Sequence, residues 1–104
     1  MRRPDVLQKC RRTLEKHYGP QFGGLVLYGS VARGQASPAS DIDLLVLLNQ
    51  PFDYFAELRR IVELLYPIQL GSDRLISAKP APRDDFERGS IQLYRNAKRE
   101  GMLV

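Results

Sequence analysis

Two long stretches of the chain carry apolar residues at helical spacing. The first predicts a helix over Asp5–Tyr18, which Gly19 and Pro20 end. The second is a broad apolar stripe that predicts a helix over Asp53–Leu65, ending before Pro67 because proline disfavours the helical conformation of the preceding residue. Each helix has one apolar face, so each must pack against another element.

Three shorter segments have the composition of strands. Leu25–Tyr28 is a short apolar segment that runs into a glycine. Asp41–Leu48 places Ile, Leu and Val in a row, which is typical of a central strand covered on both faces. Ile68–Ser77 is the third predicted strand, and Gly71 interrupts it.

The end of the chain predicts a further helical region. Pro80 and Pro82 indicate a linker, after which helices are expected over Arg83–Arg88 and Ser90–Glu100, with a break at Gly89. Three short strands cannot bury their apolar residues unaided. We therefore expect an α/β (α+β) fold, with a small mixed sheet of three or slightly more strands and helices packed on one face.

Composition narrows the class of protein. The chain has 104 residues, 43% hydrophobic and 27% charged, which predicts one globular domain over residues 1–104. Its longest apolar run, Ile42–Leu48, is much shorter than the about 20 residues that span a bilayer, so we expect a cytoplasmic protein with no membrane segment. A core of this size is thin, which leaves homo-oligomerisation open.

The single cysteine and the single histidine limit the metal chemistry. Cys10 lies on the apolar stripe of the first predicted helix, where a packed thiol is expected. With His17 as the one histidine, no Cys/His metal set can form. A bound metal must therefore be held by carboxylates, which favours Mg²⁺ or Mn²⁺.

The basic residues are concentrated in two segments, Arg2–Lys16 and Arg95–Arg99, and the formal net charge is +4. Two interpretations stay open: solvated helix faces, or a field that attracts phosphates or an acidic partner. Direct nucleic-acid binding through these helices is a weaker class of function, and it predicts an affinity that falls steeply with salt.

The residues that suggest chemistry lie between positions 29 and 44. Asp41 and Asp43 are two apart, so on a strand their carboxylates point to the same face, and a divalent cation would relieve their repulsion. Gly29 lets the backbone approach a phosphate, and Ser30 adds a hydroxyl at the start of a helical turn whose free N–H groups favour anions. Together they predict a site that a triphosphate and Mg²⁺ share.

This stretch resembles the signature of the DNA polymerase beta-like nucleotidyltransferase superfamily in its minimal form. The signature is Gly-Ser, a ten-residue interval and Asp-x-Asp, and the matching positions between them include Ala32, Arg33, Gly34 and Ser40. The resemblance implies a polymerase-beta-like fold and two Mg²⁺ ions, or Mn²⁺, on Asp41 and Asp43. It implies a nucleotide held by Gly29, Ser30, Arg33 and Ser40. For Arg33 a plain surface role stays equally open.

The same family usually has a third carboxylate on a later strand, which completes the metal site and helps to deprotonate the acceptor hydroxyl. Asp73 is the candidate for this catalytic and metal-binding position, because it precedes the apolar end of the third predicted strand. Gln69 is the alternative, since Gly71 could introduce a bulge that changes which side chains share a face. If Gln69 takes the position, the site binds nucleotide without efficient transfer.

Two functions follow from the resemblance. The first is an enzyme that transfers AMP from ATP to a hydroxyl group on a partner protein and releases pyrophosphate. The second is an antitoxin-like subunit that neutralises a HEPN-domain toxin by binding it, since the minimal family members pair with HEPN-domain proteins. Gene neighbourhood and the effect of replacing both aspartates would distinguish them.

Overall fold

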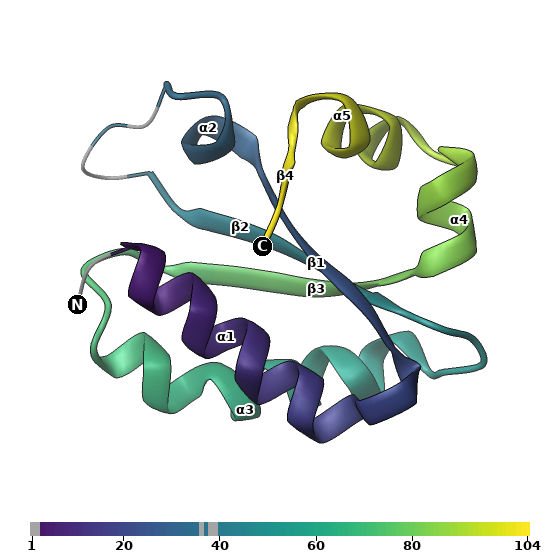
Figure 1. Cartoon of the computed structure of the whole chain (residues 1–104), viewed down its shortest axis with the longest axis horizontal. Helices are drawn as coiled ribbons and strands as arrows, with labels where there is room; N and C mark the ends of the chain where they lie inside the picture. The colour runs from purple at the N-terminus through teal and green to yellow at the C-terminus, as the bar shows by residue number, and fades with distance from the viewer. Residues whose placement is uncertain (1–2, 36, 38–39) are drawn as a thin grey trace.

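The computed structural model describes residues 3–35, 37 and 40–104. Along the chain these residues form α1 (Arg3–Tyr18), η1 (Gly19–Gln21), β1 (Phe22–Tyr28), α2 (Gly29–Ala32), β2 (Ile42–Leu48), α3 (Tyr54–Leu70), β3 (Ile76–Pro82), α4 (Arg83–Arg88), α5 (Gln92–Glu100) and β4 (Met102–Leu103). The described strands make one four-stranded sheet in the order β3-β2-β1-β4 (Figure 1). β1 pairs antiparallel with β2 and β4, whereas β2 and β3 are parallel. The sheet is mixed, as predicted.

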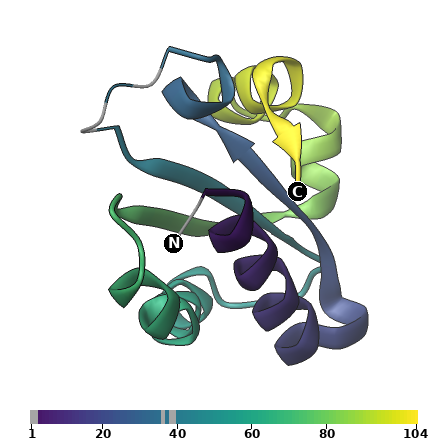
Figure 2. The same cartoon turned by 60° about the vertical axis from the view of Figure 1, so that its left-hand side comes forward.

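Two cores lie on opposite faces of the sheet. On one face α1 and α3 cover alternate residues of β2, namely Ile42, Leu44, Val46 and Leu48. On the other face Leu45 and Leu47 pack against Phe86 of α4 and Ala97 of α5. Figure 2 shows the same separation of the two helix pairs from a second direction. The fold class is confirmed and is compatible with the polymerase-beta-like nucleotidyltransferase fold, but helices cover both faces of the sheet rather than one.

The first helix buries the face that its sequence pattern indicates. Val6, Cys10, Leu14 and Tyr18 are all buried, and they recur every four residues. The hydroxyl of Tyr18 donates a hydrogen bond to the Glu57 carboxylate at 2.9 Å, which joins α1 to α3. Within the described residues no helix has both the length and the apolar composition that crossing a membrane requires.

The second long helix extends beyond its predicted end. α3 begins after Asp53, whose side chain accepts a hydrogen bond from the Ala56 N–H at 3.1 Å, and it continues through Pro67 to Leu70. Pro67 is exposed, while the buried stripe continues to Ile68 in the next turn. Packing of this turn outweighs the hydrogen bond that proline removes, so the prediction that the helix ends before Pro67 was wrong.

The third strand is also displaced from its prediction. β3 spans Ile76–Pro82, so the expected linker at Pro80 and Pro82 belongs to the strand, and the expected strand Ile68–Ser77 is mostly helix end and turn. The N–H of Ile76 points away from β2, because it donates to the side chain of Gln69. The N–H groups of residues at even positions of β3 point the same way, toward the free edge of the sheet. Pro80 and Pro82 stand at two of these positions, so the N–H that each lacks would have met no neighbouring strand. An edge strand tolerates proline there because no neighbour needs the donor.

The last part of the chain follows its prediction and adds one element. Gly89 ends α4 in the left-handed conformation (φ 66°), and α5 follows after a short turn. β4 was not predicted. Its two residues pair with Val26 and Leu27, and so cover the outer edge of β1.

Candidate functional site

The turn after β1 lies directly against the carboxylate of Asp43. Tyr28, the last residue of β1, is the ladder partner of Asp43, and Gly29 begins α2 with φ 77°. A Cβ atom added to Gly29 would lie 3.3 Å from the Asp43 Cγ and would collide with its Oδ2. Gly29 is therefore required both by its backbone conformation and by the space that the carboxylate occupies.

Asp41 and Asp43 stand at the entrance of β2. Asp41 is exposed just before the strand, and Asp43 is half-buried within it. Asp43 has the same parity as Leu45 and Leu47, so its side chain belongs to the face that α4 and α5 cover. Ile42, between the two aspartates, is buried on the opposite face under α1 and α3.

The electrostatics of Asp43 favour a bound cation. Burial, and then the nearby charge of Asp41, raise the pKa of the Asp43 carboxyl above its ordinary value. Lys79 and Arg33 oppose this rise by their positive charge. A half-buried carboxylate with a second carboxylate beside it gains from any divalent cation that neutralises the pair.

A side chain from another part of the chain holds the loop in front of Asp41. Arg74 Nη1 donates to the carbonyl oxygens of Ser37 and Ser40, at 2.7 and 2.9 Å. The N–H of Ile42 donates to the Leu75 carbonyl at 2.8 Å, immediately after the aspartate. Asp41 is thus fixed on both sides by the segment that leads into β3.

The other predicted nucleotide-binding residues surround this turn. Ser30 is half-buried in α2, and its carbonyl accepts the Gln35 N–H at 2.9 Å. Arg33 is exposed and lies 3.5 Å from a carboxylate oxygen of Glu100. The Ser40 hydroxyl accepts the N–H of Ser37 at 2.9 Å. The structure brings Gly29 against Asp43, while Arg33 and Ser40 contact neighbouring protein groups.

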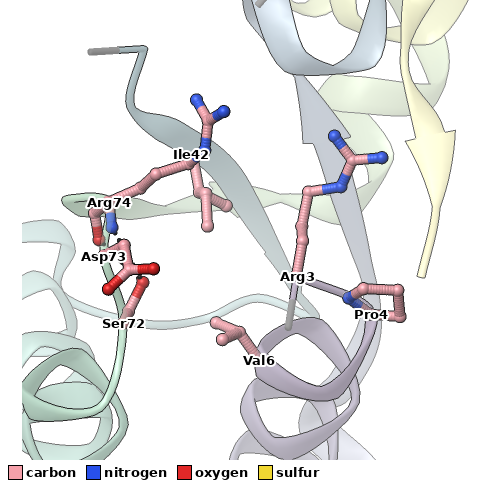
Figure 3. A pocket seen from close by; sticks show the side chains of 7 residues that line it. All are labelled: Arg3, Pro4, Val6, Ile42, Ser72, Asp73 and Arg74. Atoms are coloured by element: carbon pink, nitrogen blue, oxygen red, sulfur yellow. Dashed lines mark hydrogen bonds between the residues drawn. The ribbon is translucent and has the colours of Figure 1, made fainter. Parts of the chain in front are cut away.

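The structure does not bring Asp73 to the aspartate pair. Asp73 precedes β3 and lines a cavity of about 580 Å³. Figure 3 shows Asp73 and Ser72 on one wall of this cavity, and Arg3, Pro4 and Val6 on the other. Ile42 also lines the cavity, so Asp73 lies toward the face of β2 opposite to Asp43. In the part of the chain that the structure describes, no group of three Asp, Glu, His or Cys residues could hold a metal ion.

Gln69, the alternative candidate, has a structural position. It lies in the last turn of α3, not on a strand. Its side-chain amide donates to the Arg74 carbonyl at 3.0 Å, and its oxygen accepts the Ile76 N–H at 2.6 Å. Gln69 therefore holds together the segment that carries Arg74, and it does not reach the place beside Asp43.

Ser77 occupies the place beside Asp43, and sequence reasoning missed it. In the parallel ladder Ser77 is the partner of Asp43, and Lys79 is the partner of Leu45. The two side chains share the face of Ala81, which packs in the same core as Leu45. The signal was present in the alternation of polar and apolar residues along Ile76–Pro80, but the two prolines concealed the strand.

Tyr28 closes the inner side of the site. It packs partly buried against the core formed with α4 and α5. Burial, followed by the charge of Asp43, raises the pKa of the Tyr28 phenol to about 12. The phenol is therefore protonated at neutral pH, and it can donate a hydrogen bond but cannot act as a base.

The aspartate pair fits a magnesium ion that a substrate shares. Mg²⁺ is commonly bound by one or two carboxylates together with phosphate oxygens, and it keeps several waters. Asp41, just before β2, and Asp43, within it, supply such a pair, and the unfavourable environment of the Asp43 charge supplies the driving force. A fully protein-built cage for two ions would need further carboxylates, which the described residues do not provide around this pair.

Comparison with known proteins agrees with this geometry. A protein of Methanocaldococcus jannaschii named "Putative protein adenylyltransferase MJ0604" is 26% identical over 105 aligned residues, which cover 100% of this chain and 99% of the relative. The family described as Nucleotidyltransferase domain matches residues 7–100, a range that contains the Gly29-Ser30 turn and both aspartates. Since this match spans most of the chain, the chain belongs to the nucleotidyltransferase domain family.

Proposed function

We propose that this chain transfers AMP from ATP to a hydroxyl group of a partner protein. The observation that supports it is the close approach of the Asp43 carboxylate to Gly29, where an added Cβ would collide with it, so the proposed phosphate-binding turn lies directly beside the proposed metal-binding pair. The relative from Methanocaldococcus jannaschii carries the name of a protein adenylyltransferase, and it matches this chain over nearly its whole length.

The proposed reaction is a displacement at the α-phosphorus of ATP. The acceptor oxygen forms a bond to this phosphorus, the bond to the oxygen that bridges the α- and β-phosphates breaks, and pyrophosphate leaves with the bonding electron pair. Asp41 and Asp43 would hold the Mg²⁺, which neutralises charge on the phosphates when it is bound. The Gly29 backbone, Ser30, Arg33 and Ser40 would position the triphosphate.

The acceptor hydroxyl must transfer its proton to a base as its oxygen bonds to phosphorus. Asp73 was expected to be this base, but its carboxylate lies toward the opposite face of β2. With Ser77 beside Asp43, no third carboxylate of the described residues adjoins the pair. We therefore propose that the proton passes to solvent or to a group of the partner protein.

The test uses ATP labelled on the α-phosphate or on the γ-phosphate. The chain is incubated with Mg²⁺ and with a HEPN-domain protein, the acceptor class that the family resemblance suggests. We expect the acceptor protein to become labelled by α-labelled ATP but not by γ-labelled ATP, and to gain the mass of one AMP. Asp41→Asn with Asp43→Asn should abolish this labelling, and calorimetry should show loss of Mg-ATP binding. If the wild type and the double aspartate variant bind Mg-ATP equally, the nucleotide site is refuted.

A second candidate function is neutralisation of the same partner by binding alone. Two observations favour it: the described residues place no third carboxylate at the aspartate pair, and α3 exposes large apolar side chains, with Val62, Tyr66 and Leu70 between 57% and 70% accessible. If the double aspartate variant still neutralises the partner, binding is the function. If it forms the complex but no longer neutralises, transfer is the function.

A further inference from the structure

The β3 side of the site contains a lysine whose ammonium group has no acceptor among the described residues. Lys79 is half-buried, and it makes no hydrogen bond or ion pair with any residue that the structure describes. Three other cations of the described residues have partners: Arg33 faces Glu100, Arg74 donates to two carbonyl groups, and Lys98 donates to the Glu87 carbonyl at 2.7 Å. The ammonium group is in contact with solvent, since no buried side-chain nitrogen of the described residues lacks a partner. An incoming anion can therefore pair with Lys79 without displacing a protein group.

The strand register directs Lys79 toward the aspartate pair. Lys79 lies two residues after Ser77, the ladder partner of Asp43, and side chains two apart on a strand share a face. Neighbouring strands are about 4.8 Å apart, a distance that the long lysine side chain readily spans. The positive charge is close enough to act on the Asp43 carboxyl, whose pKa it lowers.

We infer that Lys79 binds the phosphate chain of the nucleotide and thereby supplies positive charge on the side of the site where a third carboxylate was expected. This inference rests on the proposed nucleotide site. The place of a third metal ligand is then taken by Ser77 and a cation, so part of the charge of the triphosphate is neutralised by the protein itself. A single magnesium ion on Asp41 and Asp43, together with Lys79, would be sufficient to hold the pyrophosphate as it leaves.

A purely structural role makes a different prediction. If Lys79 only balances the charge of Asp43, its removal would change the dependence of binding on Mg²⁺ by the same factor for every ligand. A phosphate contact instead affects only ligands that contain the phosphate chain. The comparison of ligands therefore separates the two roles.

The test measures binding of Mg-ATP, Mg-pyrophosphate and AMP by calorimetry to the wild type, Lys79→Met, Lys79→Arg and the control Lys9→Met. Methionine keeps the length and apolar stem of the lysine, and Lys9 is exposed on α1, across the sheet from the site. We expect Lys79→Met to weaken Mg-ATP and Mg-pyrophosphate about 10- to 100-fold, as for loss of one hydrogen bond to a charged group. AMP binding should not change, Lys79→Arg should restore part of the loss, and Lys9→Met should bind as the wild type does.

The outcomes also separate this inference from the proposed function. If Lys79→Met folds normally and binds Mg-ATP as tightly as the wild type, the role of Lys79 is refuted while the nucleotide site stands. If the wild type binds no ATP, the proposed function fails. The binding of Mg-pyrophosphate by the wild type and Lys79→Met then tests the role of Lys79 separately. Thermal unfolding of each variant controls for misfolding. If Lys79→Arg keeps the charge but binds Mg-ATP no better than Lys79→Met, the inference is contradicted.

Discussion

Arg74 donates a hydrogen bond to the carbonyl oxygen of Ser40, the residue in front of Asp41, at 2.9 Å. The same nitrogen donates to the Ser37 carbonyl at 2.7 Å. A side chain at the entrance of β3 thus positions the loop that leads to a proposed metal-binding residue. Gln69 in turn fixes the backbone of Arg74, so the geometry of Asp41 depends on residues that are far from it in the sequence.

Replacing Arg74 should impair transfer more than folding. Arg74→Met removes both hydrogen bonds to the loop, and a misplaced Asp41 is expected to lower the rate of AMP transfer about 100-fold, the order of effect that a displacement of about 1 Å can have. The rate measured against Mg²⁺ concentration, with thermal unfolding in parallel, checks this. Arg74→Lys should recover part of the rate, because an ammonium group can still reach one carbonyl. An unchanged rate at all Mg²⁺ concentrations would show that the loop does not need this anchor.

Gly29 should be irreplaceable for a reason that Gly34 does not share. Both glycines have positive φ, at 77° and 72°, so alanine at either position should cost about 1–2 kcal/mol of stability. Only at Gly29 would the added Cβ collide with the Asp43 carboxylate, since no atom of the described residues lies within 4 Å of the corresponding point at Gly34. We expect Gly29→Ala to lose Mg-ATP binding and Gly34→Ala to keep it, as measured by calorimetry beside chemical denaturation. Similar binding losses in both variants would contradict the steric argument.

Removing the charge of Asp43 should stabilise the protein in the absence of Mg²⁺. The folded state holds the Asp43 proton more tightly than the unfolded state does, because burial and then Asp41 raise its pKa against the opposing charges of Lys79 and Arg33. The wild type therefore loses stability as pH rises from the ordinary carboxyl pKa through the raised value, and Asp43→Asn does not.

Thermal unfolding across a pH series tests this expectation. Asp43→Asn should unfold at a higher temperature than the wild type near neutral pH, and the difference should disappear in acid, where both side chains are neutral. Adding Mg²⁺ should narrow the difference at neutral pH by stabilising the wild type. Glu63→Gln, on the exposed surface of α3, is the control for losing one negative charge. A wild type more stable than Asp43→Asn at neutral pH without Mg²⁺ would overturn the argument.

Cys10 should be unreactive in the folded protein. Its side chain is fully buried in the core under α1, and burial raises the pKa of the thiol to about 11. Alkylation by iodoacetamide at neutral pH should be slow in the native protein and fast in denaturant, because the thiolate is the reactive form. A cysteine introduced by Gln8→Cys, exposed on the same helix, should react rapidly under native conditions. Equal labelling of the two thiols would mean that α1 opens readily.

The sequence by itself determined the parts of this protein that depend on nearby residues. The apolar spacing of the first helix, the apolar run of β2 and the break at Gly89 are local signals, and the structure agrees with each. The spacing of the Gly29-Ser30 turn and the two aspartates likewise indicated one site, since a strand end and the next strand entrance are joined by a short loop.

Only the tertiary structure decided what stands beside Asp43. The extension of α3 through Pro67 shifted the start of β3, and parallel pairing with β2 then placed Ser77 at the expected position of an acid. The prolines gave the opposite local signal, because the cost of a proline depends on whether a neighbouring strand needs the missing N–H and on how much packing the extra helical turn gains. Register between strands that are distant in sequence is set by the packing of both faces, and no local pattern contains it.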